Sequence, residues 1–166
     1  MSKFTLESDF SYDFTLFGIS CHETEYRLCF MLNRELGFNF VRERSLEINS
    51  KKLKQTFGFS IFSSEDTQTL EKIYLVCNYN KNVKSEPLVT SGVFQSGLFD
   101  NAPEFAQART LLIPEKPDID FFLLLPLSFS ESFISSIQEK LNRLENILSC
   151  VEINPDSLDS KINLLF

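Results

Sequence analysis

The chain has 166 residues, and its composition of 43% hydrophobic and 23% charged residues is typical of one globular domain. Its formal net charge of −7 disfavours binding to the phosphate backbone of nucleic acids and to anionic membrane surfaces. No stretch reaches the length of a membrane-spanning helix and the first residues carry no apolar signal-peptide core, so we expect a single cytoplasmic domain over residues 1–166.

The first predicted elements are a strand and a helix. Residues 12–19 are mostly apolar, which predicts a buried strand. Ser20 and Glu23 have the spacing of a capping box, which predicts a helix over 23–36. Gly37 follows at the position where a helix ends in the left-handed conformation.

Strand patterns and an irregular segment come next. Residues 38–48 favour a second strand, and the alternation over 55–62 and 71–79 predicts a hairpin. Residues 80–112 contain Pro, Gly and short apolar islands without a regular period. A connection of this length is uncommon in a compact domain, so we interpret it as a lid or cover.

The last third of the chain repeats the strand and helix pattern. Residues 119–125 are almost continuously apolar, which predicts a central strand buried on both faces. A second capping box, Ser128 with Glu131, predicts an amphipathic helix over 131–145. Two further strands are predicted at 150–154 and, as a final edge strand, at 162–166.

The order of these elements predicts the fold class. Two strand–helix–strand units that interleave in one sheet give an α+β fold of ferredoxin-like arrangement. We therefore expect a mixed, mostly antiparallel sheet extended by the hairpin, with the two main helices on one face.

The central strand is preceded by a motif. Ile113, Pro114 and Glu115 are followed after three residues by Ile119, Asp120 and Phe121. This pattern resembles the signature of the bacterial IPExxVDY family, with one residue more in the spacer and with Ile119 and Phe121 in place of Val and Tyr. Residues 26–37 and 158–166 also resemble that family, so the resemblance covers the whole chain. The family has no assigned activity, and the resemblance implies no mechanism.

Two groups of side chains invite a catalytic interpretation. Cys21 and His22 are neighbours near a helix start, but adjacent helical residues do not face each other, and we expect both to be dispensable. Glu115, Asp118 and Asp120 would suit a hard cation in a metal-dependent enzyme. The simpler interpretation is that the first two lie on a loop and Asp120 caps the strand or pairs with a cation. We expect no cofactor.

Surplus apolar residues point to a binding surface. The core stripe of the first helix is predicted to consist of Leu28, Cys29, Leu32 and Leu36. The apolar residues outside it are Tyr26, Phe30 and Met31. Phe94 and Phe99 lie in the irregular segment and are predicted to join them in one partner or ligand surface. The opposing hypothesis is that residues 80–112 simply cover the helix.

These patterns favour a non-enzymatic interaction module. We expect it to bind itself or another protein, and its four cysteines, without any framework spacing, to be free thiols in a reducing compartment. The alternative is a carrier or sensor of a small apolar ligand. A metal-dependent enzyme that uses the acidic residues is a further alternative.

Overall fold

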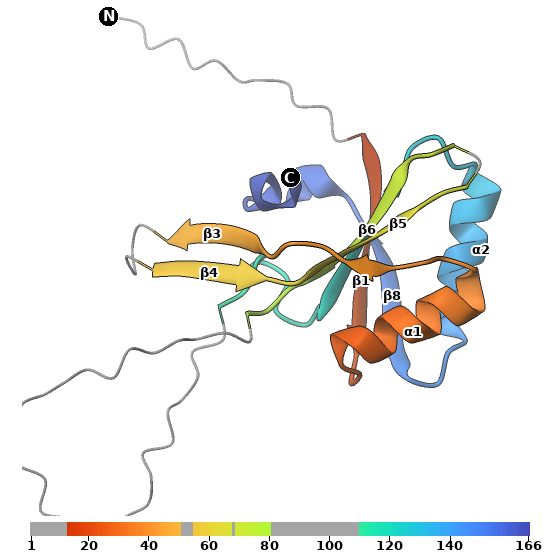
Figure 1. Ribbon diagram of the computed structural model, residues 1–166, viewed down its shortest axis with the longest axis horizontal. Coiled ribbons are helices and arrows are strands. Elements are labelled where there is room, and N and C mark those ends of the chain that lie inside the picture. Colours follow the sequence, from red (N-terminus) through yellow and green to blue (C-terminus); the bar gives the residue numbers. More distant parts are fainter. Residues whose placement is uncertain (1–12, 51–54, 68, 81–109) are drawn as a thin grey trace, which may run out of the picture.

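The computed structural model describes residues 13–50, 55–67, 69–80 and 110–166 (Figure 1). This part of the chain forms a six-stranded sheet in the order β2-β5-β6-β7-β1-β8 and a two-stranded sheet, β3-β4. The strands of the larger sheet are β1 (Phe14–Cys21), β2 (Val41–Arg42), β5 (Ile61–Glu65), β6 (Lys72–Cys77), β7 (Phe121–Pro126) and β8 (Ile147–Ile153). The remaining elements are β3 (Leu46–Ser50), β4 (Gln55–Phe59), the α-helices α1 (Glu25–Leu36) and α2 (Glu131–Asn142), and the 3-10 helices η1 (Pro155–Ser157) and η2 (Lys161–Leu164).

The four central strands have the predicted ferredoxin-like arrangement. The units β1-α1-β6 and β7-α2-β8 interleave, which gives the order β8-β1-β7-β6. Strand β5 pairs with β6 as a hairpin and, with β2, extends this sheet. The predicted α+β fold is therefore confirmed, with the difference that every described strand pair is antiparallel.

Strand β7 lies at the centre of the sheet. It pairs with β1 on one side and β6 on the other, and all six of its residues are buried. Phe121, Leu123 and Leu125 belong to one hydrophobic cluster, whereas Phe122 and Leu124 belong to a second cluster on the opposite face. The prediction of a doubly buried central strand is confirmed.

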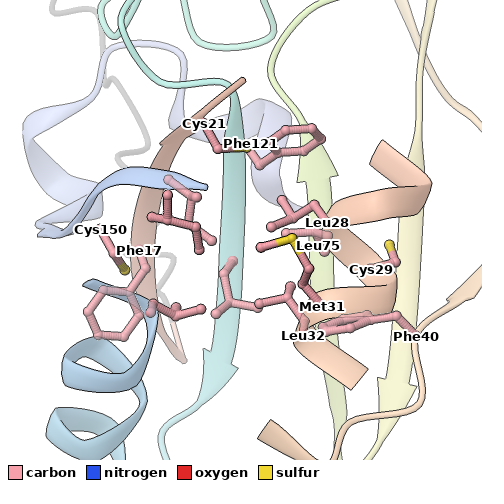
Figure 2. Close-up of a cluster of buried hydrophobic side chains, with 14 of the residues drawn as sticks. Phe17, Cys21, Leu28, Cys29, Met31, Leu32, Phe40, Leu75, Phe121 and Cys150 are labelled. Carbon is pink, nitrogen blue, oxygen red and sulfur yellow. The ribbon is translucent and has the colours of Figure 1, made fainter. Parts of the chain in front are cut away.

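Both α-helices cover the same face of the sheet, as predicted (Figure 1). Figure 2 shows Leu28, Met31 and Leu32 of α1 directed toward Leu75 and Phe121 of the sheet. Helix α2 contributes Ile137 and Leu141 to the same cluster. Gly37 ends α1 with a φ of 74°, the left-handed conformation that its sequence position predicted.

The small sheet β3-β4 and irregular segments cover the other face. Figure 1 shows β3-β4 and the C-terminal 3-10 helices on the side of the sheet opposite α1 and α2. Phe57 and Phe59 of β4 pack there with Ile113 and Ile119 from the segment before β7. We call Leu158–Phe166 the C-terminal strap; its buried residues Leu158 and Leu164 complete the cluster.

Neither predicted capping box forms, although α2 begins at Glu131 as predicted. Ser20 lies within β1 and its hydroxyl donates to the carbonyl of Asp118, so it is not available to cap α1. Helix α1 starts after Thr24, which makes no side-chain cap. Ser130, not Ser128, caps α2 by accepting from the Phe133 amide, and the Ser128 hydroxyl donates to Glu71 instead.

Three predicted strand boundaries are wrong. The single strand expected over 38–48 is split into β2 and β3, and the hairpin partner of β6 is β5 rather than a strand over 55–62. Residues 55–59 pair with β3 in the smaller sheet. Residues 162–166 do not form an edge strand, because they lie in and after the 3-10 helix η2.

The two edges of the larger sheet are closed in different ways. Strand β2 has only two residues, which leaves little backbone for pairing with another chain. At the other edge, the Asn142 side chain accepts from the Cys150 amide at 2.8 Å and donates to its carbonyl at 3.1 Å. Gln138 donates to the same carbonyl at 3.3 Å. Side chains of α2 thus occupy the backbone groups of Cys150, which β8 would otherwise offer to a further strand.

We expect Asn142→Ala to lower the free energy of unfolding by about 1 kcal/mol, because the backbone of the buried Cys150 loses two hydrogen bonds. Urea unfolding followed by circular dichroism measures the effect. Asn146→Ala is the matched control, because the Asn146 amide donates to the Met31 sulfur over 3.8 Å, which is a weaker bond than those of Asn142. Equal stability of the two variants would contradict the role given to Asn142.

Candidate functional site

The motif that precedes β7 forms a loop around one buried amide. Asn78 is 0% exposed, and its Nδ2 donates to the carbonyls of Lys116 (2.9 Å) and Ile119 (2.7 Å). Its Oδ1 accepts from the Ile113 amide at 2.9 Å. We call residues 112–120 the motif loop. Sequence analysis did not single out Asn78, because a lone Asn at a strand end carries no local signal.

The motif loop also holds the C-terminal strap. Glu115 Oε1 accepts from the Ser160 amide at 2.7 Å, and Asn163 donates to the Leu112 carbonyl at 2.9 Å. Burial raises the pKa of Glu115, but hydrogen bonds from its own backbone and from Ser160 outweigh this and leave the pKa below its ordinary value. The anchor therefore contributes at neutral pH and is lost as the pH falls through the folded pKa.

The three carboxylates of the metal hypothesis do not converge. Glu115 contacts the strap. Asp120 Oδ2 instead accepts, at 2.8 Å, from the amide of Cys21, the last residue of β1. Asp118 lines a polar hollow of about 420 Å³ between the motif loop and the end of β8. No group of three potential ligands is close enough to hold a metal within the described residues. Asp120 thus has the capping role of the simpler interpretation.

The cysteines are buried thiols. All four are free, and burial raises the pKa of Cys21 to about 11 and those of Cys29 and Cys150 to about 12. Cys21 ends strand β1 and does not lie at a helix start, so no helix N-terminus lowers its pKa. His22, beside it, is exposed.

Helix α1 presents an exposed stripe of aromatic and cationic side chains. We call Tyr26, Arg27, Phe30 and Arg34 the α1 outer stripe. Tyr26 and Phe30 are 60% and 62% exposed. The Arg34 guanidinium lies 5.8 Å from the Phe30 ring centre, and Arg42 of β2 donates to the Tyr26 hydroxyl at 3.2 Å.

One residue of the predicted apolar surface, Met31, belongs to the core instead. Met31 is 7% exposed and packs in the cluster under α1, so its predicted place outside the core is wrong. A 12-residue helix that packs on both a sheet and α2 needs a wider apolar face than the predicted core stripe. Phe94 and Phe99 lie outside the described residues.

A groove of about 440 Å³ lies where the second face of the sheet is incompletely covered. Tyr74 of β6 and Leu124 of β7 contribute to its floor, and Phe14 lies at the start of β1. The end of the strap forms a wall, where Phe166 meets Tyr74 edge to face with ring centres 5.1 Å apart. Sequence analysis missed the groove because its lining comes from both ends and the middle of the chain.

Comparisons with known proteins add no relative: no family model, curated protein or solved structure matches the chain. The resemblance to the IPExxVDY family therefore stays a prediction. Among the described residues, no helix has the length and apolar character needed to cross a bilayer.

Asn78→Ala should lower the free energy of unfolding by about 3 kcal/mol, because the Ile113 amide and the Ile119 carbonyl both lose their bonds to the buried side chain, while the Lys116 carbonyl keeps its bond from the Ile119 amide. Asn163→Ala, which removes one bond to the same loop, should cost about 1 kcal/mol. Chemical denaturation of both variants measures the difference. Similar losses for the two would contradict the central position of Asn78.

The thiol of Cys21 should react slowly with an alkylating reagent in the folded protein. With a pKa of about 11, about one thiol in a thousand is ionised at pH 8. Mass spectrometry after iodoacetamide treatment should find Cys21 unmodified until denaturant is added. Rapid, selective modification near neutral pH would contradict this assignment and would reopen a nucleophilic role.

Proposed function

We propose that this domain is a non-enzymatic interaction module that self-associates through the α1 outer stripe. The observation that carries the proposal is the pair of exposed rings, Tyr26 and Phe30, set among arginines on one helix face. Tyr and Arg are enriched among the residues that dominate binding energy at protein interfaces. The second copy of the chain is the partner that the charges favour.

The charge distribution supports self-association at this face. The chain has a net charge of −7, so two copies repel each other over most of their surfaces. Around the α1 outer stripe, by contrast, three arginines and three glutamates balance: Arg27 pairs with Glu23, Arg34 with Glu35, and Arg42 with Glu25. Of the six, Arg27, Arg34 and Glu35 have exposed side chains, and we expect a two-fold axis through this face to bring the arginines of one copy near Glu35 of the other.

The two edges of the larger sheet are less suitable for self-association than the α1 outer stripe. Strand β2 is too short to pair with a second sheet, and Asn142 occupies the backbone of Cys150 in β8. Association through strands would need these contacts to break first. A helix-mediated contact needs no such rearrangement.

The non-enzymatic part of the proposal rests on the fate of the candidate catalytic groups. The Cys21 thiol has a raised pKa, and Glu115 and Asp120 accept hydrogen bonds that position the backbone. Four free, buried cysteines fit a reducing compartment, and we place the module in the cytoplasm. We retain the IPExxVDY family as the proposed relative.

Phe30→Ser tests the proposal. Light scattering should find a dimer for the unchanged chain and a monomer for the variant, because the exposed ring is lost from the centre of the contact. The free energy of unfolding should change by about 1 kcal/mol or less, since the ring is largely in solvent. Leu148→Ser on β8, a side chain with the same 62% exposure, is the matched control and should stay dimeric.

Charge reversal on α1 provides a second, independent test of self-association through this helix. Arg34→Glu removes the net positive charge of the α1 outer stripe and places a second carboxylate beside Glu35, so it should weaken the dimer at low salt. Arg143→Glu, at the C-terminal end of α2, should not. A monomeric unchanged chain would contradict the proposal. So would a dimer that Leu148→Ser disrupts as strongly as Phe30→Ser.

A further inference from the structure

We propose that the groove between β6, β7 and the C-terminal strap binds a small, uncharged and largely apolar molecule. The groove shares no residue with the α1 outer stripe, so this site is independent of the proposed self-association. Its volume of about 440 Å³ lies within the range of small-molecule sites in proteins.

The lining of the groove sets the chemistry of the ligand. Three aromatic rings, those of Phe14, Tyr74 and Phe166, face the space with Leu124 and Leu165. An apolar ligand that displaces water from these walls binds favourably, because apolar surface is buried. The walls also offer the displaced water few hydrogen bonds. Tyr74 supplies the one hydroxyl among the lining side chains, which suits a ligand with a single polar group.

Charged side chains of both signs line the groove, namely Asp13, Glu71 and Lys72, so they do not select one kind of ion. Lys72 lines the groove, but its Nζ pairs with Glu43 Oε1 at 3.1 Å, and this pair raises the pKa of Lys72. The Ser63 hydroxyl and Lys72 both donate to Glu43 and lower its pKa. Glu71 accepts from the Ser128 hydroxyl. A charged ligand would have to compete with these contacts, whereas an uncharged one leaves them intact.

The backbone of the floor disfavours a peptide. Leu124 lies in β7 between two paired strands, so the amides and carbonyls of the floor already bond to β1 and β6. A peptide laid in the groove would bury its own backbone groups without partners there, at a cost for each. The groove is also too small for a helix, whose diameter with side chains is about 10–12 Å. A small molecule avoids both penalties.

The neutral fluorescent probe N-phenyl-1-naphthylamine tests this site on the full chain. The chain contains no Trp, so the probe's emission is read without interference from the protein. We expect saturable binding of one probe per chain. Phe166→Ala should weaken that binding about tenfold, because the ring that forms one wall is removed.

Matched controls separate the groove from other apolar surfaces. Phe30→Ala removes an exposed ring on α1 and should leave the probe affinity unchanged. Leu165→Arg, which places a charge at the wall, should abolish binding while circular dichroism stays native, since Leu165 is 38% exposed. If Phe166→Ala failed to fold, the Leu165 variant alone would decide.

Four outcomes would overturn the proposal. They are non-saturable binding, equal loss of binding in Phe30→Ala and Phe166→Ala, unchanged binding in Leu165→Arg, and binding that appears only after residues 1–12 are removed. The last result would assign the groove to the chain's own N-terminal residues. A dimer that persists in Phe166→Ala while probe binding falls would show that the ligand site and the self-association surface are distinct.

Discussion

The burial of β7 on both faces is the constraint on which the structure depends. A strand with six buried residues, Phe121–Pro126, requires an apolar layer on each side of the sheet. Two amphipathic helices supply the first layer by the usual packing of a helix stripe on a sheet. No third long helix covers the opposite face in the described part of the chain, and β4, the motif loop and the C-terminal strap take its place.

Because much of this cover is irregular, its stability depends on hydrogen bonds made by a few polar side chains. Segments without regular secondary structure must satisfy their backbone groups through side chains, and Asn78 does this for the motif loop. Glu115 then ties the strap to that loop through the Ser160 amide. Such a cover need not be continuous, and the groove beside Phe166 is the place where it ends. In the helical layer, Tyr26 and Phe30 on the outside of α1 are 60% and 62% exposed, more than Phe133 of α2 at 40%.

The parts of the fold that the sequence predicted are those set by local pattern. The apolar run over 119–125 predicted the central strand, and the two amphipathic stripes predicted helices on one face. The capping boxes failed because the Ser20 and Ser128 hydroxyls bond to Asp118 and Glu71, which are 98 and 57 residues away. Residues 162–166 were predicted as a strand because a run of five residues is too short for its apolar pattern to separate a strand from a helical turn; η2 buries Leu164 and leaves Ile162 59% exposed. Asn78 and the groove arise from contacts between distant segments, which no local pattern contains.

The central claim is that the motif loop and the strap form a cover that is separate from, and less stable than, the sheet beneath it. Amide hydrogen exchange measured by NMR on the unchanged chain and on Glu115→Ala tests it most directly. The account predicts that the Ser160 amide is protected in the unchanged chain, and that Glu115→Ala speeds its exchange while the Phe122 amide of β7 stays protected. An unprotected Ser160 amide in the unchanged chain, or an equal loss of protection at Phe122 in the variant, would contradict it.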